Sequence, residues 1–246
     1  MSEFYLPTDS QHLLLIGKNG SGKTRAAVWH LAQKDLANSK WIVINHKREE
    51  LINSVPGAKF MNMDTVPKED ENGVFIYQPR PETDDAMVSA LLWHVYENER
   101  IGVYIDEGTM IHPRDPALAA LYTQGRSKKT PVITLSQRPS RISRYAVSEA
   151  AHIQVFQLTD KRDRKTIQEF IPIDLDDYML PQNGNPRVLQ PYHSIYYDTY
   201  ADEPFIMAPV PGDDEILAIF EEKLVVPETE ENNELMGDNI VKINIL

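Results

Sequence analysis

The stretch Gly17-Lys18-Asn19-Gly20-Ser21-Gly22-Lys23-Thr24 decides the fold of this chain. It follows the apolar run Leu13-Leu14-Leu15-Ile16 and precedes residues 25–32, which have helical composition. A strand, a glycine-rich loop ending in lysine and a hydroxyl, and then a helix form the phosphate-binding loop G-x-x-x-x-G-K-[ST] in its expected context. A chance glycine-rich turn is the plain alternative, and the eight matching positions with correct flanks argue against it.

The residue types of this loop suit a bound triphosphate. Its three glycines allow backbone conformations that a Cβ would hinder, so that N–H groups turn toward an anion. The helix that starts near Lys23 adds the positive end of its dipole. Lys23 is expected to reach the β- and γ-phosphates and the Thr24 hydroxyl to ligate Mg²⁺. The predicted ATP contacts are Gly17, Lys18, Asn19, Gly20, Ser21, Gly22, Lys23, Thr24 and Arg25.

Length and composition fit one α/β domain with additions. The chain has 246 residues, of which 41% are hydrophobic and 25% charged, as in ordinary soluble globular proteins. No apolar run approaches the roughly 20 residues that cross a bilayer, and no secretory signal is visible, so we expect no integral membrane segment. The chain has no cysteine, which excludes disulfides and cysteine nucleophiles, and its seven histidines form no metal-binding pair.

Charge is unevenly distributed along the chain. The formal net charge of −12 argues against nucleic acid as a partner. However, residues 201–246 hold twelve acids against two lysines, whereas the first 200 residues hold 25 acids and 23 bases. The interval 117–148 has no acid and six cations, namely Arg126, Lys128, Lys129, Arg138, Arg141 and Arg144. A solvated helix face and a band that binds a polyanion both remain open at this point.

Apolar runs alternate with helical segments through most of the chain. Continuous apolar runs, typical of strands buried on both faces, lie at 11–16, 41–44, 74–77, 101–105, 132–136 and 153–158. Helices are predicted at 23–36, 83–99, 116–125, 147–150 and 163–170, and a short helix is predicted to begin within 46–51 and to end at Pro56-Gly57. Residues 59–73 are predicted to be irregular. This alternation implies right-handed β-α-β units, and hence an α/β fold with a mainly parallel central sheet flanked by helices.

We divide the chain into three parts. Residues 1–172 are the predicted P-loop ATPase core, an α/β domain of ordinary size. Residues 173–226 are a C-terminal extension, and residues 227–246, rich in Glu and Asn, are predicted to be an acidic, disordered tail. In the extension we expect a hairpin and a helix, at 187–189 with 194–197 and at 215–224.

A pair of carboxylates follows the apolar strand at 101–105. This strand brings Asp106 to the carboxyl edge of the sheet, where ligands bind in open α/β folds, and there Asp106 can hold Mg²⁺ directly or through water. Glu107 is the expected general base that orients and deprotonates the attacking water. Two acids after a strand also suit a solvated turn, but Lys23 and Thr24 together favour a hydrolytic site.

Gln137 ends the strand predicted at 132–136. If this strand lies between the first strand and the strand of Asp106, the Gln137 amide faces the γ-phosphate and can report hydrolysis. With any other strand order, Gln137 is simply a polar residue at a strand end. This prediction therefore depends on the fold.

Taken together, these residues resemble the FtsK–HerA superfamily of RecA-like ATPases. The resemblance covers residues 11–170 and rests on the phosphate loop, on Val103-Tyr104-Ile105-Asp106-Glu107, and on Gly125-Arg126-Ser127 followed by Ser136-Gln137-Arg138-Pro139. Many unrelated NTPases share the two nucleotide motifs, whereas the spacing from Gly-Arg to Ser-Gln-Arg-Pro carries the specificity. Within the superfamily, a short chain without a membrane segment is most similar to viral genome-packaging ATPases.

The resemblance implies a RecA-like fold of the ASCE type, and subunits that form a ring of five or six with ATP at their boundaries and double-stranded DNA in the centre. It implies an arginine finger that acts on the neighbouring subunit's nucleotide, with Arg126 in the matching place and Arg144 as second candidate. It also implies a capsid vertex or portal as partner, in the host cytoplasm at the assembling virion. The segment Asn45-His46-Lys47-Arg48 departs from the acidic or proline-containing turn that is frequent in the family, which leaves its role open.

A packaging motor needs contacts to DNA phosphates, because such contacts give affinity without reading sequence. The candidate residues are Lys128, Lys129, Arg138, Arg141, Arg144 and Lys47.

Three other functions are weighed against packaging. A cellular HerA-like or conjugation-type DNA pump usually has extra domains or membrane helices. A filamentous-phage assembly ATPase would need a transmembrane helix in this chain or in a partner. A non-motor P-loop nucleotide switch or kinase would bind nucleotide without DNA, and a kinase would add an acceptor site and a lid. Glu107 and the arginine-rich interval favour a multisubunit ATPase.

Overall fold

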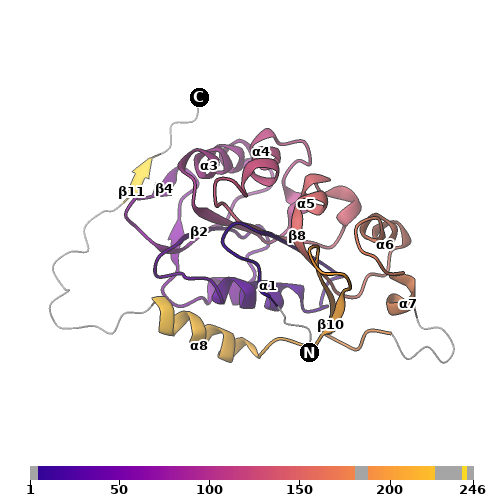
Figure 1. Cartoon of the computed structure of the whole chain (residues 1–246). Helices are drawn as coiled ribbons and strands as arrows, with labels where there is room; N and C mark the ends of the chain where they lie inside the picture. The colour runs from indigo at the N-terminus through magenta and orange to yellow at the C-terminus, as the bar shows by residue number, and fades with distance from the viewer. Residues whose placement is uncertain (1–4, 181–187, 225–239, 243–246) are drawn as a thin grey trace.

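A mostly parallel sheet forms the centre of the structure, a computed structural model that describes residues 5–180, 188–224 and 240–242 (Figure 1). Within these residues the sheet has nine strands. Their order across the sheet is β10 (Phe205–Met207), β9 (Ser194–Asp198), β8 (Ala150–Val155), β1 (His12–Ile16), β7 (Val132–Ser136), β6 (Ile101–Ile105), β2 (Lys40–Ile44), β5 (Gly73–Tyr77) and β3 (Lys59–Met61).

The strands from β8 to β3 run parallel, and β9 and β10 add antiparallel pairs at one end. Every residue of β1, β2, β5, β6 and β7 is buried, which explains why these strands are continuous apolar runs. The predicted α/β class with a mainly parallel sheet is confirmed.

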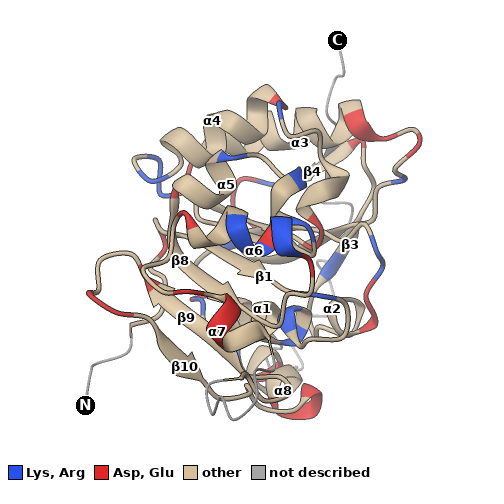
Figure 2. Cartoon of the chain, turned by 90° about the vertical axis from the view of Figure 1, so that its right-hand side faces the viewer, with Lys and Arg blue, Asp and Glu red and all other residues tan. Residues whose placement is uncertain are grey.

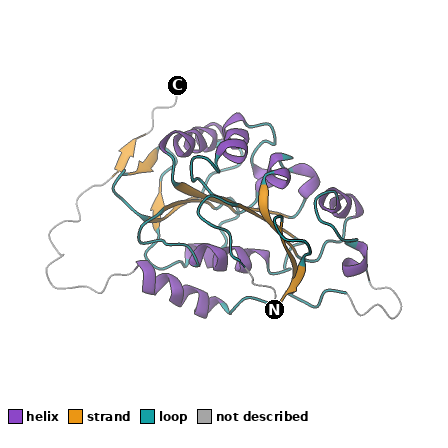
Figure 3. Ribbon diagram, in the orientation of Figure 1, coloured by secondary structure: helices purple, strands orange, loops and turns teal. Residues whose placement is uncertain are grey.

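Helices cover both faces of the sheet (Figure 3). On one face lie α1 (Lys23–Ala32) and α8 (Asp213–Leu224), and on the other α3 (Asp85–Asn98), α4 (Pro116–Gln124), α5 (Tyr145–Ser148) and α6 (Lys161–Gln168). Alternate residues of β1 serve the two faces, with Leu13 in the α1 core and Leu14 in the α3–α4 core. The shorter elements are α2 (Glu50–Asn53), α7 (Asp176–Met179) and the 3₁₀ turns η1 (Gly108–Met110) and η2 (Pro139–Arg141). No helix in the described ranges is both long enough and apolar enough to cross a bilayer.

One local prediction in the first half of the chain is wrong. Residues 59–73 are not irregular throughout: they contain β3, which extends the main sheet beside β5, and β4 (Thr65–Pro67). These strands are only three residues long, too short for a periodic pattern. The short helix predicted to begin within 46–51 is confirmed as α2, which starts at Glu50. It starts no earlier because the Asn45 side chain accepts a hydrogen bond from the Glu49 N–H (3.0 Å) and Arg48 takes a left-handed φ of 56°.

The C-terminal hairpin differs from the prediction. Strand β9 pairs with β10, and its other edge pairs with β8, so the predicted extension continues the sheet of the core. Residues 188–189 form no strand; instead the Leu189 N–H donates to the Tyr178 carbonyl, and Arg187 lies outside the described residues. The predicted helix is confirmed as α8, whose Ile216 and Phe220 are buried.

The predicted tail contains one strand. Residues Ile240–Lys242 form β11, which pairs antiparallel with β4 in a separate small sheet, so the prediction of disorder is wrong for these three residues. Residues 227–239 and 243–246 of this predicted tail lie outside the described residues.

Candidate active site

The phosphate loop joins the carboxyl end of β1 to α1 and is anchored to the strands on both sides. The Gly17 N–H donates to the Ser136 carbonyl at the end of β7 (3.2 Å), and the Lys18 N–H donates to the Gln157 carbonyl after β8 (2.9 Å). Gly22 directly precedes α1 with a φ of 98°, a conformation that side chains rarely allow. The sequence motif thus becomes a loop held between two neighbouring strands.

Close packing explains the first glycine of the motif. A Cβ at Gly17 would lie 2.6 Å from both the Phe156 Cβ and the Ser21 Oγ, so a larger residue would displace the loop. Asn19 is exposed, and Lys18 is half-buried. Arg25 is directed to the surface, where its Nε donates to Asp213 of α8 (2.6 Å).

Lys23 lies inside the loop and is only 3% exposed. Its Nζ donates to the Lys18 carbonyl across the loop (3.4 Å). Burial lowers the pKa of Lys23, the charge of Lys47 lowers it further, and Glu107 and Asp106 oppose that change. A phosphate bound in the loop would stabilise this buried ammonium group in its charged form.

Asp106 follows β6, and its N–H donates to the Ile44 carbonyl of β2 (3.1 Å). Both of its carboxylate oxygens are buried and have no hydrogen-bond partner among the described residues, and the same holds for the Ser21 hydroxyl. Burial raises the pKa of Asp106 to about 6, which the charge of Lys47 partly opposes. A buried carboxylate without partners is costly, so this site fits a divalent cation or its water ligands, with the half-buried Thr24 at the start of α1.

Glu107 is nearly enclosed, at 5% exposure, and both of its oxygens are engaged. Its Oε2 lies 3.1 Å from the Lys47 Nζ. Its Oε1 accepts hydrogen bonds from the Thr109 hydroxyl (3.0 Å) and from the Gln137 N–H (3.4 Å). The glutamate is therefore positioned by the ends of three strands, β6, β7 and β2.

The condition placed on Gln137 is met, because β7 lies between β1 and β6. Its backbone bonds the predicted base, and its half-buried side chain stands at the same carboxyl edge as the phosphate loop. The following residue is held in place as well: the Arg138 N–H donates to the Ser136 hydroxyl (3.0 Å). The role of Gln137 as a reporter of the γ-phosphate stays a prediction.

Arg126 lies at the opposite edge of the sheet. It follows α4 and precedes β7, whose five residues separate it from Gln137 by about 16 Å of strand. Its guanidinium donates to the Tyr200 hydroxyl (3.0 Å) and stacks on that ring, 5.9 Å from its centroid. Arg126 is therefore remote from the phosphate loop of its own chain, and its predicted role in a neighbour's site stays a prediction.

Three of the six cations of the acid-free interval are paired with acids from elsewhere in the chain. Lys128 pairs with Glu99 at 2.9 Å, and Arg144 with Glu169 at 3.1 Å. Arg138 pairs with Asp160 at 3.1 Å and with Asp163 at 3.2 Å, the latter at the start of α6, where Figure 2 shows both signs of charge side by side. Lys129 and Arg141 have no ion pair among the residues described.

Lys47 lies apart from the other predicted DNA contacts, and its role as one stays a prediction. It stands in the nucleotide site against Glu107, because strand β2 lies directly beside β6. The roles of the other candidates as DNA contacts, those of Lys128, Lys129, Arg138, Arg141 and Arg144, stay predictions.

A small pocket beside the phosphate loop was not expected from the sequence. It has a volume of about 40 Å³ and is formed by Gly22 and Phe156 together with Tyr192, Pro209 and Val210 of the C-terminal part. Tyr192 is 54% exposed, has a φ of 63°, and would lie 3.2 Å from a Cβ at Gly22. The sequence could not indicate this pocket, because Tyr192 is far from the phosphate loop along the chain. The pairing of β9 with β8 brings it there.

Comparison with known proteins identifies the family. The sequence model of the Zonular occludens toxin (Zot) family matches residues 13–168. Over 216 residues the chain is 50% identical to the DNA packaging ATPase P9 of Enterobacteria phage PRD1, covering 88% of this chain and 94% of that protein.

Solved structures with a similar fold include the DNA-packaging ATPase B204 of Sulfolobus Turreted Icosahedral Virus. Its TM-score is 0.65 at 17% identity, over 84% of this chain and 100% of that chain. VirB4 of Thermoanaerobacter pseudethanolicus gives a TM-score of 0.63 at 10% identity, over 83% and 90% of the two chains. These structures support the fold, and the relative in phage PRD1 confirms the resemblance to viral packaging ATPases. The chain belongs to the Zot family and is a homologue of the PRD1 DNA packaging ATPase P9.

Proposed function

We propose that this chain is an ATPase that packages double-stranded DNA into a bacteriophage capsid. The observation that carries the proposal is the position of Glu107, which the order β1-β7-β6 places at the same sheet edge as the phosphate loop and in contact with the end of the Gln137 strand. The identity of 50% to a protein named as a DNA packaging ATPase supports DNA as the substrate that is moved.

Each residue of the site has a task in hydrolysis. The loop N–H groups and Lys23 hold the β- and γ-phosphates. Glu107 accepts a proton from water while the water oxygen bonds the γ-phosphorus and the bond to the β-phosphate oxygen breaks, leaving ADP and phosphate. Thr24 and Asp106 would hold Mg²⁺, which neutralises phosphate charge when bound. Gln137 reports the loss of the γ-phosphate through its strand.

The pocket of Tyr192 receives the nucleotide base. It adjoins Gly22, and therefore lies where the loop passes into α1, and its walls are an aromatic ring and the apolar Pro209–Val210 segment. A volume of about 40 Å³ is little more than the space of one water molecule. The exposed Tyr192 ring must therefore rotate outward to stack on a purine.

The site is completed by a neighbouring subunit in a ring of five or six. Arg126 cannot serve its own chain from the far edge of the sheet, whereas a head-to-tail arrangement presents it to the next subunit's nucleotide. A guanidinium there stabilises the charge that develops on the transferred phosphoryl group. The ring stands at a capsid vertex or portal of the assembling virion in the host cytoplasm.

Phosphate release by the full chain, with and without duplex DNA, tests this function. At low salt and at concentrations where subunits associate, we expect duplex DNA to stimulate the release. A DNA-translocating ATPase couples ATP hydrolysis to the DNA that it moves. A nucleotide switch or a kinase would give the same rate with and without DNA. Absence of stimulation would overturn the packaging function, and single-stranded DNA provides the matched polyanion control.

A further inference from the structure

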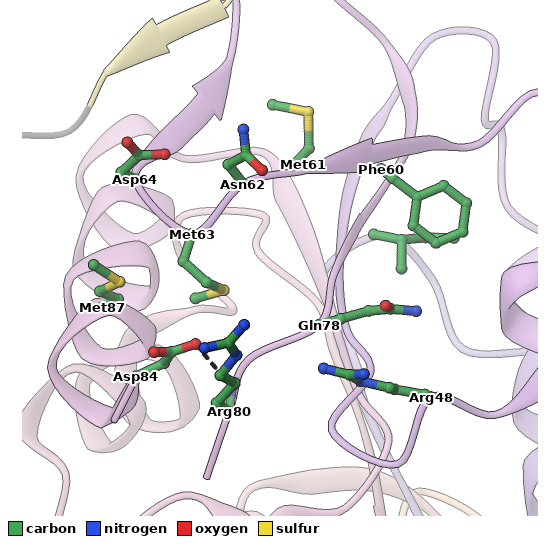
Figure 4. A pocket seen from close by; sticks show the side chains of 11 residues that line it. Arg48, Phe60, Met61, Asn62, Met63, Asp64, Gln78, Arg80, Asp84 and Met87 are labelled. Carbon is green, nitrogen blue, oxygen red and sulfur yellow. Dashed lines mark hydrogen bonds between the residues drawn. The ribbon is translucent and has the colours of Figure 1, made fainter. Parts of the chain in front are cut away.

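A second cleft opens at the carboxyl ends of β2, β5 and β3, apart from the phosphate loop (Figure 4). It has a volume of about 620 Å³. Arg48, Gln78 and Arg80 line it after β2 and β5, with Arg80 beside Asp84 in Figure 4, and Met61 and Met63 line it from β3 and the residues after it. The cleft thus presents two guanidinium groups and an amide at the sheet edge that also carries the nucleotide site.

Arg48 is adjacent in sequence to the lysine that holds the catalytic glutamate. Lys47 points to Glu107, with Nζ and Oε2 3.1 Å apart. Arg48 has a φ of 56°, and its exposed side chain enters the cleft instead. One tight turn therefore carries two cations: Lys47 contacts the proposed general base Glu107, and Arg48 contacts solvent.

A network of amides connects this turn to the cleft. The Gln78 side chain donates to the Asn53 Oδ1 (2.8 Å), and the Asn45 side chain donates to the same oxygen (2.9 Å). Asn53 in turn donates to the Arg48 carbonyl (3.2 Å). A ligand that moves Arg48 or Gln78 will therefore move the backbone of the turn, since all these groups share hydrogen bonds.

Neither arginine of the cleft, Arg48 or Arg80, forms an ion pair among the described residues. Arg80 is nevertheless close to Asp84, whose pKa is lowered by the hydrogen bonds from the Arg80 N–H and the Thr83 hydroxyl and also by the charge of Arg80. The cleft also holds two carboxylates. Asp84 is engaged by the Arg80 N–H (2.8 Å) and the Thr83 hydroxyl (2.7 Å), and Asp64 lies on the side away from Arg48 in Figure 4. By contrast, Lys128, Arg138 and Arg144 of the basic interval already have carboxylate partners.

We propose that this cleft binds the sugar-phosphate backbone of duplex DNA through Arg48 and Arg80, and that the Lys47–Arg48 turn transmits this binding to Glu107. The proposal rests on the proposed function, since it assumes DNA as the ligand. Guanidinium groups bind phosphate oxygens in a fixed, bidentate geometry. A phosphate that draws Arg48 outward pulls Lys47 from Glu107, and the freed carboxylate oxygen can then accept a proton from water.

Lys47 is a positioning residue in this arrangement. While it is bound to Glu107, Lys47 takes one acceptor position of Oε2, and the other oxygen accepts from Thr109 and Gln137. Lys47 then competes with water for Oε2, so we expect basal hydrolysis to be slow. DNA binding releases Glu107 from Lys47, and ATP hydrolysis is thereby coupled to the presence of DNA.

The test compares full-length variants for phosphate release and for binding of a short, blunt-ended duplex. The double variant Arg48→Ala with Arg80→Ala should keep the wild-type basal rate and ATP affinity but lose DNA stimulation. Its salt dependence of duplex binding, as a log–log slope, should fall by about 1.8 for two lost phosphate contacts. Arg100→Ala is the matched control, because Arg100 is an exposed arginine with a φ of 51° at the other edge of the sheet; it should behave as wild type.

Lys47→Met tests the link to the base without DNA. We expect a basal rate several-fold above wild type and insensitive to duplex DNA, whereas Lys47→Arg should restore the low, stimulated pattern. Thermal melting and ATP binding verify that each variant is folded. A fall in the basal rate of Lys47→Met would overturn the proposal, because Lys47 would then assist the chemistry.

The outcomes separate this proposal from the function on which it rests. Stimulation of wild type together with unchanged stimulation of the Arg48/Arg80 double variant refutes the cleft alone. A wild type that duplex DNA does not stimulate refutes the packaging function, and the cleft with it. Loss of subunit association in the double variant, with its duplex binding intact, would assign the cleft to a neighbouring chain and also refute the DNA site.

Discussion

The backbone N–H of Gln137 donates to the Oε1 of Glu107 across 3.4 Å. Gln137 follows β7, and Glu107 comes two residues after β6, so this contact joins the ends of the two strands. The group assigned to deprotonate water and the strand assigned to report the γ-phosphate are thus in direct contact. A displacement of either strand end changes the position of the other, which gives hydrolysis a physical path into the rest of the subunit.

Replacement of Tyr192 tests the base pocket. Tyr192→Ala should weaken ATP binding roughly 5- to 150-fold, because aromatic stacking on a base contributes about 1–3 kcal/mol. Tyr192→Phe retains the ring and should bind ATP as wild type does. Titration with a fluorescent ATP analogue measures both variants.

Competition by inorganic tripolyphosphate supplies the control for this pocket, since that ligand has no base. Tyr192→Ala should leave its affinity unchanged. Equal losses for ATP and for tripolyphosphate would show that the substitution damages the loop beside Gly22 and not a base contact.

Asp106 should make the stability of the nucleotide-free chain depend on pH. Its pKa is raised to about 6 by burial, so the folded state takes up a proton more readily than the unfolded state, in which the pKa of this carboxyl has its ordinary value of 3.8. Protonated Asp106 therefore contributes to the free energy of unfolding. This contribution is complete below pH 4 and is lost as the pH rises through 6. Asp106→Asn removes this dependence, and its free energy of unfolding relative to wild type should rise by about 2–3 kcal/mol between pH 4 and pH 7.

Denaturant unfolding at several pH values measures this difference. The buried histidines His12, His30, His46 and His152, whose pKa values are lowered by burial, act in the same pH range with the opposite sign. Their contribution is common to both proteins and cancels in the comparison. Parallel stability curves for wild type and Asp106→Asn would contradict the assignment. Added Mg²⁺ with ATP should stabilise wild type more than the variant.

Arg126 should act on the neighbouring subunit. Arg126→Ala subunits mixed with wild type should lower phosphate release more steeply than their fraction in the mixture, because each one disables the site of an adjacent wild-type subunit. The loss at a site without its finger should be on the order of 10³-fold or more. Arg162→Ala, on the exposed side of α6, is the control and should leave the mixture active. Activity in simple proportion to the wild-type fraction would argue against a role in trans.

The sequence was sufficient for those parts of the site that lie within a few residues of each other. The phosphate loop and the Asp106–Glu107 pair each follow a buried strand, and short-range patterns specify such units. The position of Gln137 could be predicted only conditionally, because it depends on β7 lying between β1 and β6. Strand order is set by packing between distant segments, which no local pattern records.

What the sequence could not show shares this origin. Lys47 was a candidate DNA contact, and the pairing of β2 with β6 brings it against Glu107. The acid-free interval left a solvated face and a polyanion-binding band both open, and the structure pairs Lys128 with Glu99 at the end of α3 and Arg144 with Glu169 at the end of α6. Tyr192 reaches the phosphate loop only because β9 adds to β8. In each case the decisive neighbour lies far away along the chain.

The most direct test of the central claim is one experiment on Glu107→Gln, in which ATP binding and phosphate release are measured on the same sample with duplex DNA present. The amide keeps the size of the side chain but cannot accept the proton from water. We predict ATP affinity close to wild type and phosphate release reduced by about 10²- to 10⁴-fold. Phosphate release near the wild-type rate, or loss of ATP binding, would contradict the assignment of Glu107 as the base of this packaging ATPase.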